Sequence, residues 1–101
     1  METRIYTKPI LVIPGRRLTE LPADIHLYTN LQKLDCNCNN LTHLDNLPQS
    51  LIELWCHNNK ITKLNNLPQS LKELSCYFGN PLEYDFKPTL ENIRSYVASV
   101  R

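Results

Sequence analysis

Two ten-residue segments of this chain are almost identical and begin twenty positions apart. Residues 45–54 read DNLPQSLIEL and residues 65–74 read NNLPQSLKEL, so they differ only at Asp45/Asn65 and Ile52/Lys72. Chance is a poor explanation for such a match in a chain of 101 residues. A fixed internal period indicates similar units that stack on one another, because one unit of this length cannot bury its apolar face alone.

The same period extends over most of the chain and can be written LxxLxCxxNxLxxLxxLPxS. Leu31, Leu51 and Leu71 begin three successive copies. A longer copy precedes them, in which Leu11 holds the position that Leu34 holds in the second copy. We expect a single domain, because 101 residues allow one small core. Within this domain (1–101) we distinguish an N-terminal flank (1–10), four units (11–30, 31–50, 51–70 and 71–90) and a C-terminal partial unit or cap (91–101).

This unit resembles the leucine-rich repeat, whose signature LxxLxLxxN/CxL recurs every 20–29 residues. With its LPxSL segment it is most similar to the short repeats of bacterial type III effectors, and similar units occur in repeat families of amoebae and their giant viruses. The resemblance covers about residues 8–95 and implies a leucine-rich-repeat solenoid, of the α/β solenoid class but mostly β and irregular. In the ubiquitin-ligase effectors of this kind the catalytic cysteine lies in a separate helical domain, for which this chain has no room.

Each position of the unit has a physical reason. The LxLxC segment predicts a short strand, and we expect strands of successive units to pair in parallel on a concave face, with extended or 3-10 return segments behind them. Leucines at the first, fourth, eleventh and fourteenth positions are expected to point inward. An asparagine follows each strand where the chain turns, and its amide can bond backbone groups of its own unit and the next. These asparagines are Asn39, Asn59 and Asn80.

The C-terminal segment, residues 87–101, fits two structures. Leu90 and Ile93 repeat the LxxL opening of a unit, which favours a further strand over about residues 92–96. Ile93, Val97 and Val100 are also spaced along one helix face, and Thr89 could cap the N-terminus of a helix. We prefer the strand, although a C-terminal cap helix stays open. The strand would leave an unpaired sheet edge that favours self-association or a partner strand.

Four cysteines raise the question of metal binding or disulfides. The N-terminus has no apolar secretory segment, so we expect an intracellular protein (cytoplasmic, or in the host cytoplasm for a viral or effector protein) with reduced thiols. The cysteines of the three clear units would form a linear column, which is not a tetrahedral metal site. We therefore expect them to fill the core and expect no cofactor or metal. The alternative metal site uses Cys36, Cys38, Cys56 and His57.

Several function classes are disfavoured by composition. Eleven Lys and Arg residues balance ten Asp and Glu residues, which gives no reason to expect nucleic acid or a membrane surface as partner. No glycine-rich phosphate loop or catalytic signature is present. Cys56 and His57 are adjacent, so a strand would direct them to opposite faces. We expect no catalysis.

The outward strand positions give the candidate functional surface. The only tryptophan, Trp55, occupies such a position, where the core does not explain it. Exposed aromatic residues with a polar rim are typical of protein-binding hot spots. We predict that this face binds a protein partner; the alternative is a self-assembling protein, a homodimer formed through an edge strand or through Trp55. The predicted binding residues are Val12, Lys33, Asp35, Glu53, Trp55, His57, Glu73, Tyr77 and Phe78.

Overall fold

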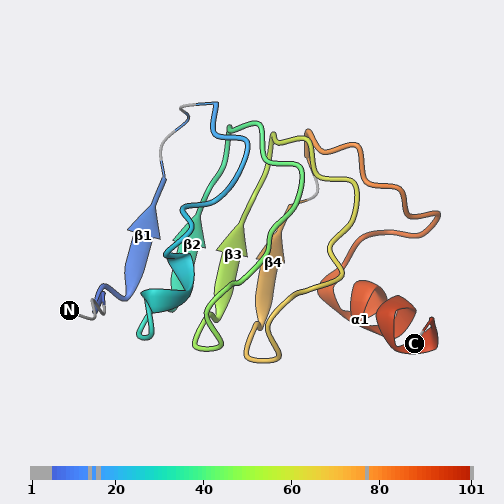
Figure 1. Cartoon of the computed structure of the whole chain (residues 1–101). Helices are drawn as coiled ribbons and strands as arrows, with labels where there is room; N and C mark the ends of the chain where they lie inside the picture. Colours follow the sequence, from blue (N-terminus) through green and yellow to red (C-terminus); the bar gives the residue numbers. More distant parts are fainter. Residues whose placement is uncertain (1–5, 14, 16, 77, 101) are drawn as a thin grey trace.

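A computed structural model of the protein describes residues 6–13, 15, 17–76 and 78–100. Four short strands form one parallel sheet in chain order (Figure 1). A return segment joins each strand to the next; the first contains a 3-10 helix, η1 (Ile25–Leu27), and an α-helix, α1 (Leu90–Ser99), follows the last. The strands are β1 (Ile10–Val12), β2 (Lys33–Asp35), β3 (Glu53–Trp55) and β4 (Glu73–Ser75).

The strand register equals the sequence period. Leu11 pairs with Leu34, Leu34 with Leu54, and Leu54 with Leu74, all in parallel. The predicted parallel strands are therefore confirmed, including the longer first interval. A twenty-residue spacing sets this register because each return segment brings the chain back beside the preceding strand at the same height.

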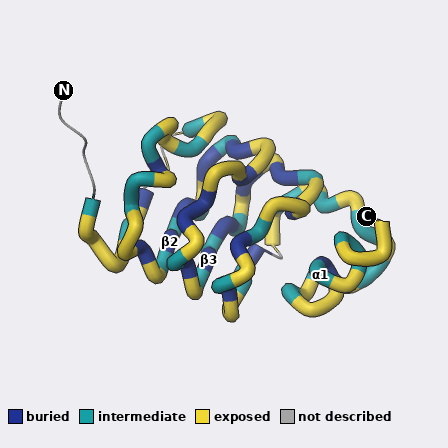
Figure 2. Tube along the Cα trace, turned by 60° about the horizontal axis from the view of Figure 1, so that its bottom comes forward, coloured by how far each residue is buried: buried dark blue, intermediate teal, exposed yellow. Residues whose placement is uncertain are grey.

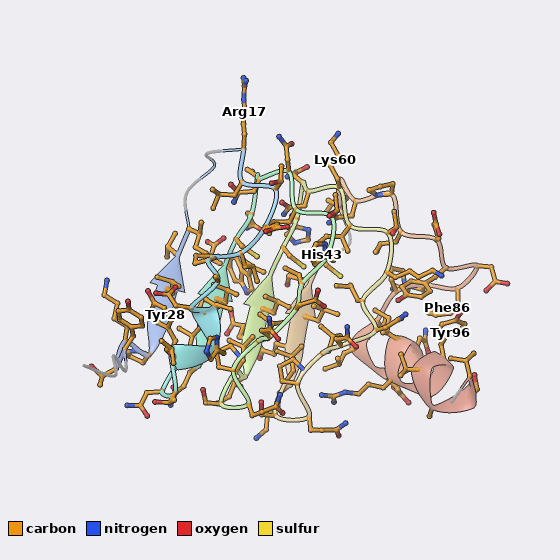
Figure 3. All side chains as sticks on the ribbon, in the orientation of Figure 1. Arg17, Tyr28, His43, Lys60, Phe86 and Tyr96 are labelled. Atoms are coloured by element: carbon orange, nitrogen blue, oxygen red, sulfur yellow. The ribbon has the colours of Figure 1, made fainter. Side chains whose placement is uncertain are left out.

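The core lies between the sheet and the return segments, and Figure 2 shows buried positions along the interior of the chain trace. Leu34 and Leu54, each with a strand on both sides, are fully buried, whereas Leu74 in the last strand is only half-buried. The predicted inward positions are confirmed as buried for Leu31, Leu34, Leu41, Leu44, Leu51, Leu54, Ile61, Leu64 and Leu71, together with Cys36, Cys56 and Cys76. The corresponding leucines of the first and last units are only half-buried; they are Leu11, Leu18, Leu21, Leu74 and Leu82.

Asparagine side chains join each unit to the one before it. The Asn59 Oδ1 accepts a hydrogen bond from the Leu41 amide at 3.0 Å, and its Nδ2 donates to the carbonyls of Cys36 and Cys56 at 3.1 and 3.2 Å. The prediction that this asparagine bonds its own unit is confirmed. The expected bond from this asparagine to the following unit is wrong. Asn59 instead bonds the unit before its own, because the N–H of Leu41 in that unit points toward Asn59.

Most of the C-terminal segment forms the helix α1 (Leu90–Ser99), so the preferred strand over residues 92–96 is wrong. The Thr89 Oγ1 accepts a hydrogen bond from the Asn92 amide at 3.1 Å and caps α1. Ile93 is buried and Val97 packs against the core, which is the one-faced burial that helical spacing provides. The helix is favoured because its backbone N–H and C=O groups bond one another. A strand at the end of the sheet would leave these groups unpaired along its outer edge.

α1 is the longest helix formed by the described residues. No helix in this part of the chain is long and apolar enough to cross a membrane.

Candidate functional site

The residues that flank the central leucine of each strand point away from the core, because side chains alternate along a strand. We call these residues the outer sheet face. It contains two rows that run across the strands in register. The rows are Ile10, Lys33, Glu53 and Glu73, and Val12, Asp35, Trp55 and Ser75.

Trp55 is held on this face by a lysine of the neighbouring strand. The Lys33 Nζ lies 4.1 Å from the centroid of the Trp55 ring and 3.5 Å from the Glu53 Oε2. A lysine over an indole is a favourable cation–π contact, whereas a surface ion pair alone contributes little. Trp55 is therefore half-buried rather than free. Lys33 is one of the predicted binding residues, but its contact with Trp55 was not predicted. The strand register explains this contact, because Lys33 and Trp55 are diagonal neighbours on adjacent strands.

The exposed apolar part of the face lies on β1. Ile10 and Val12 are 56% and 58% exposed. Val12 aligns with Asp35, and Asp35 aligns with Trp55, so two strand spacings, about 10 Å, separate Val12 from the indole. The predicted patch that joins Val12 to Trp55 is thus interrupted by Asp35, whose Oδ1 accepts a hydrogen bond from the Asn37 amide at 3.1 Å.

A second group lies just beyond the C-terminal ends of the strands. His57 accepts a hydrogen bond at Nδ1 from the Phe78 amide at 3.1 Å, and the two ring centroids are 5.8 Å apart. The His57 amide donates to the Asn37 Oδ1, and Phe78 is 69% exposed. The structure therefore brings two predicted binding residues together here. Tyr77, the third predicted member, lies outside the described residues.

The two glutamates of the outer sheet face have different surroundings. Glu53 is paired with Lys33, as described above. Glu73 is exposed on β4, and among the described residues no cation lies within ion-pair distance of its carboxylate. In this part of the chain, the end of the face at β4 therefore carries a carboxylate that forms no ion pair.

Three of the cysteines form the buried column that the sequence predicts. The Cys36 thiol lies 3.4 Å from the Trp55 carbonyl, and burial raises the pKa of this thiol to about 12. The Cys56 thiol donates a hydrogen bond to the Cys76 sulfur. That bond, together with burial, raises the pKa of Cys56 well above its ordinary value. The same bond lowers the pKa of Cys76, although burial of Cys76 acts in the opposite direction. At neutral pH these contacts favour protonated thiols in Cys36 and Cys56.

The alternative metal site of Cys36, Cys38, Cys56 and His57 is not assembled in this part of the chain. Cys38 is exposed, whereas Cys36 and Cys56 are buried. Among the described residues, no three histidine, cysteine, aspartate or glutamate side chains are close enough together to hold a metal ion.

No protein-family model matches the chain, and neither does any curated protein or solved structure. Its function is therefore inferred from its own sequence and geometry.

Proposed function

We propose that this chain is a small leucine-rich-repeat solenoid that binds a protein partner through its outer sheet face and catalyses no reaction. The solenoid is supported by the equality of sequence period and strand register. It is also supported by the asparagine contacts, which join each unit to the unit before it. We infer an intracellular partner, because reduced thiols persist there.

The position of Trp55 carries the functional proposal. Tryptophan is enriched at binding hot spots, and here it lies on an outward strand position instead of in the core. Ile10 and Val12 add exposed apolar surface on the same face, and Glu53 and Glu73 supply a charged rim. The Lys33 Nζ over the Trp55 ring restricts the indole, which lowers the side-chain entropy that partner binding would cost.

Affinity capture from the source cell, followed by quantitative mass spectrometry, tests the proposal. We expect Trp55→Ala to abolish retention of specific partners and Val12→Ala to weaken it. Val100→Ala is the matched control, because it makes the same truncation at a valine that is 61% exposed on the C-terminal side of α1. Thermal unfolding of each variant checks that the fold is kept.

Equal retention by all variants would place the partner site outside the outer sheet face. Sedimentation equilibrium of the purified protein separates partner binding from self-assembly. A stable dimer that dissociates on Trp55→Ala would assign this face to a second copy and would contradict the proposal.

A further inference from the structure

At the edge of β4, backbone groups lack the hydrogen bonds that the equivalent groups of the earlier units make with the following unit. The carbonyls of Pro9, Gln32 and Ile52 each accept two N–H bonds from the following unit, at 2.8–3.0 Å. The equivalent carbonyl of the last unit belongs to Lys72. It receives no such bond from the residues that the structure describes, so the acceptor at the start of β4 is open.

Backbone donors at the other end of β4 follow the same rule. The amides of Ile13, Cys36 and Cys56 donate to a carbonyl of the following strand at 2.7–2.8 Å. The Cys76 amide is the equivalent donor of the last unit, and it has no acceptor in the described part of the chain. An acceptor and a donor at this spacing are the groups that a parallel strand requires.

A third open group lies in the turn after β4. The amides of Leu18, Leu41 and Ile61 each donate to the asparagine Oδ1 of the following unit, at 3.0–3.2 Å. The corresponding amide in the last unit is that of Leu82, and the described residues provide no asparagine for it. The three open groups thus match the contacts that one more strand and its asparagine would make.

Behind the sheet, α1 already covers the return segment that leads into β4. Ser50 and Ser70 each donate a hydrogen bond from Oγ to a leucine carbonyl of the preceding unit, at 2.7 Å. For the Leu71 carbonyl, the Arg94 Nη2 takes the place of the next serine, at 2.8 Å. Figure 1 shows α1 beyond β4, where a further return segment would run. α1 and Arg94 therefore occupy the place that the return segment of a complete additional unit would need, whereas the edge of β4 leaves room for a bare strand.

Charge indicates what kind of strand fits. Lys33 lies beside Glu53 in the β2–β3 register and forms an ion pair with it. A strand added to β4 would place one residue beside Glu73, whose carboxylate has no cation nearby among the described residues. Its next residue would cover the half-buried Leu74. Opposite charges across neighbouring strands stabilise pairing, and an apolar residue over Leu74 removes apolar surface from water.

We propose that the β4 edge binds an extended segment of a partner protein as a fifth parallel strand. The segment carries a basic residue beside Glu73 and an apolar residue over Leu74. An asparagine five positions after the apolar residue accepts the hydrogen bond of the Leu82 amide. Main-chain bonds supply affinity and the side chains supply specificity, as in other cases of strand addition. This edge site is separate from the outer sheet face and does not depend on Trp55.

The chain itself contains a probe with this pattern. Residues 31–41 carry Lys33, Leu34 and Asn39 in the required order. We would label a synthetic peptide of this sequence with fluorescein, with Cys36→Ala and Cys38→Ser to prevent oxidation, and measure binding by fluorescence anisotropy. We expect saturable binding to the wild-type protein, weakened about fivefold or more by Lys33→Glu in the peptide. Glu73→Lys in the protein should reverse this preference between the two peptides.

Backbone methylation supplies a matched control. N-methylation of Lys33 in the peptide removes one of the two N–H groups that would donate to the Lys72 carbonyl and places a methyl group against that carbonyl. The Glu73 amide makes the equivalent bond to the Ile52 carbonyl. N-methylation of Leu34 alters an N–H that points away from β4, because amide directions alternate along a strand. We expect the first peptide to lose binding and the second to keep it. The Trp55→Ala protein should bind the peptide as wild type does.

Three results would overturn the proposal. Absence of saturable peptide binding, or equal loss of binding with both methylated peptides, would show that the edge does not accept a strand. Equal binding of the peptides to the wild-type and Glu73→Lys proteins would contradict the prediction that the partner segment carries a basic residue beside Glu73. A homodimer seen by sedimentation and dissociated by Glu73→Lys would assign the edge to a second copy.

Discussion

The middle of the sheet and its C-terminal end consist of the same unit but differ in what surrounds it. Leu54 in β3 has a strand on each side and is fully buried. Leu74 holds the same position in β4, has a strand on one side only, and remains half-buried. Burial in this fold therefore comes from neighbouring units and not from the unit that contains the residue.

Truncation of these two leucines gives the largest expected effect. Leu54→Ala should lower the free energy of unfolding by about 2–5 kcal/mol, because it leaves a cavity between two strands. Leu74→Ala should cost about 1–2 kcal/mol, because a half-buried side chain removes less apolar surface from water. Chemical denaturation of both variants and wild type measures the difference. Equal losses would show that the end of the sheet is covered as well as its middle.

The effect of alkaline pH on stability provides a second comparison between the middle and the end of the sheet, and its expected size is intermediate. Burial raises the pKa of Cys36, which directly follows β2, to about 12 from an ordinary value of 9.0. The pKa of Cys76, which follows β4, is instead lowered by its bond from Cys56. A raised pKa means that the folded protein keeps a proton that the unfolded chain loses. The stability associated with the protonated Cys36 is thus fully present below about pH 9 and declines toward pH 12.

We expect the unfolding free energy of wild type to fall more steeply above pH 9 than that of Cys36→Ala, by up to about 1.4 kcal/mol per pH unit. Denaturation curves from pH 6 to pH 11 measure this difference. The range from pH 6 to pH 8 serves as the internal control, because the thiol is protonated in both the folded and the unfolded protein there. Parallel curves over the whole range would contradict the burial of Cys36.

The smallest effect concerns the helix that covers one half of the C-terminal end. Arg94 donates to the carbonyls of Pro68, Gln69 and Leu71 at 2.8–3.2 Å. Arg94→Ala should destabilise the protein by about 1 kcal/mol and lower the hydrogen-exchange protection of α1. All three bonds come from Nη2, and the lysine ammonium lies one bond closer to the backbone, so Arg94→Lys keeps the charge but does not reach these carbonyls.

We expect Arg94→Lys to resemble Arg94→Ala in α1 protection, while amides of β2 and β3 keep their protection in both variants. Loss of protection throughout the sheet would show that α1 is part of the same cooperative unit as the middle, and the contrast between the two regions would fail.

The sheet could be predicted from sequence because its determinants lie at a constant interval. Leu34, Leu54 and the cysteines of the same units recur every twenty residues, which fixes the register and the inward column together. The candidate face followed directly, since Glu53 and Trp55 flank an inward leucine.

The C-terminal end could not be predicted in the same way. Leu90 and Ile93 satisfy both the strand and the helix spacing, and the choice is made by tertiary contacts that the spacing does not contain. The role of Arg94 depends on carbonyl groups of residues 68, 69 and 71, which any side chains at those positions would present equally. The open edge of β4 likewise depends on where α1 lies.

The identical registers of β2 on β3 and of β3 on β4 have a consequence for how long such a protein can be. A junction between two units looks the same wherever it is made, so an in-frame duplication of residues 51–70 would insert one strand without disturbing η1 or α1. Strand number is then free to change by whole units during evolution or engineering, while the two terminal segments decide where growth stops.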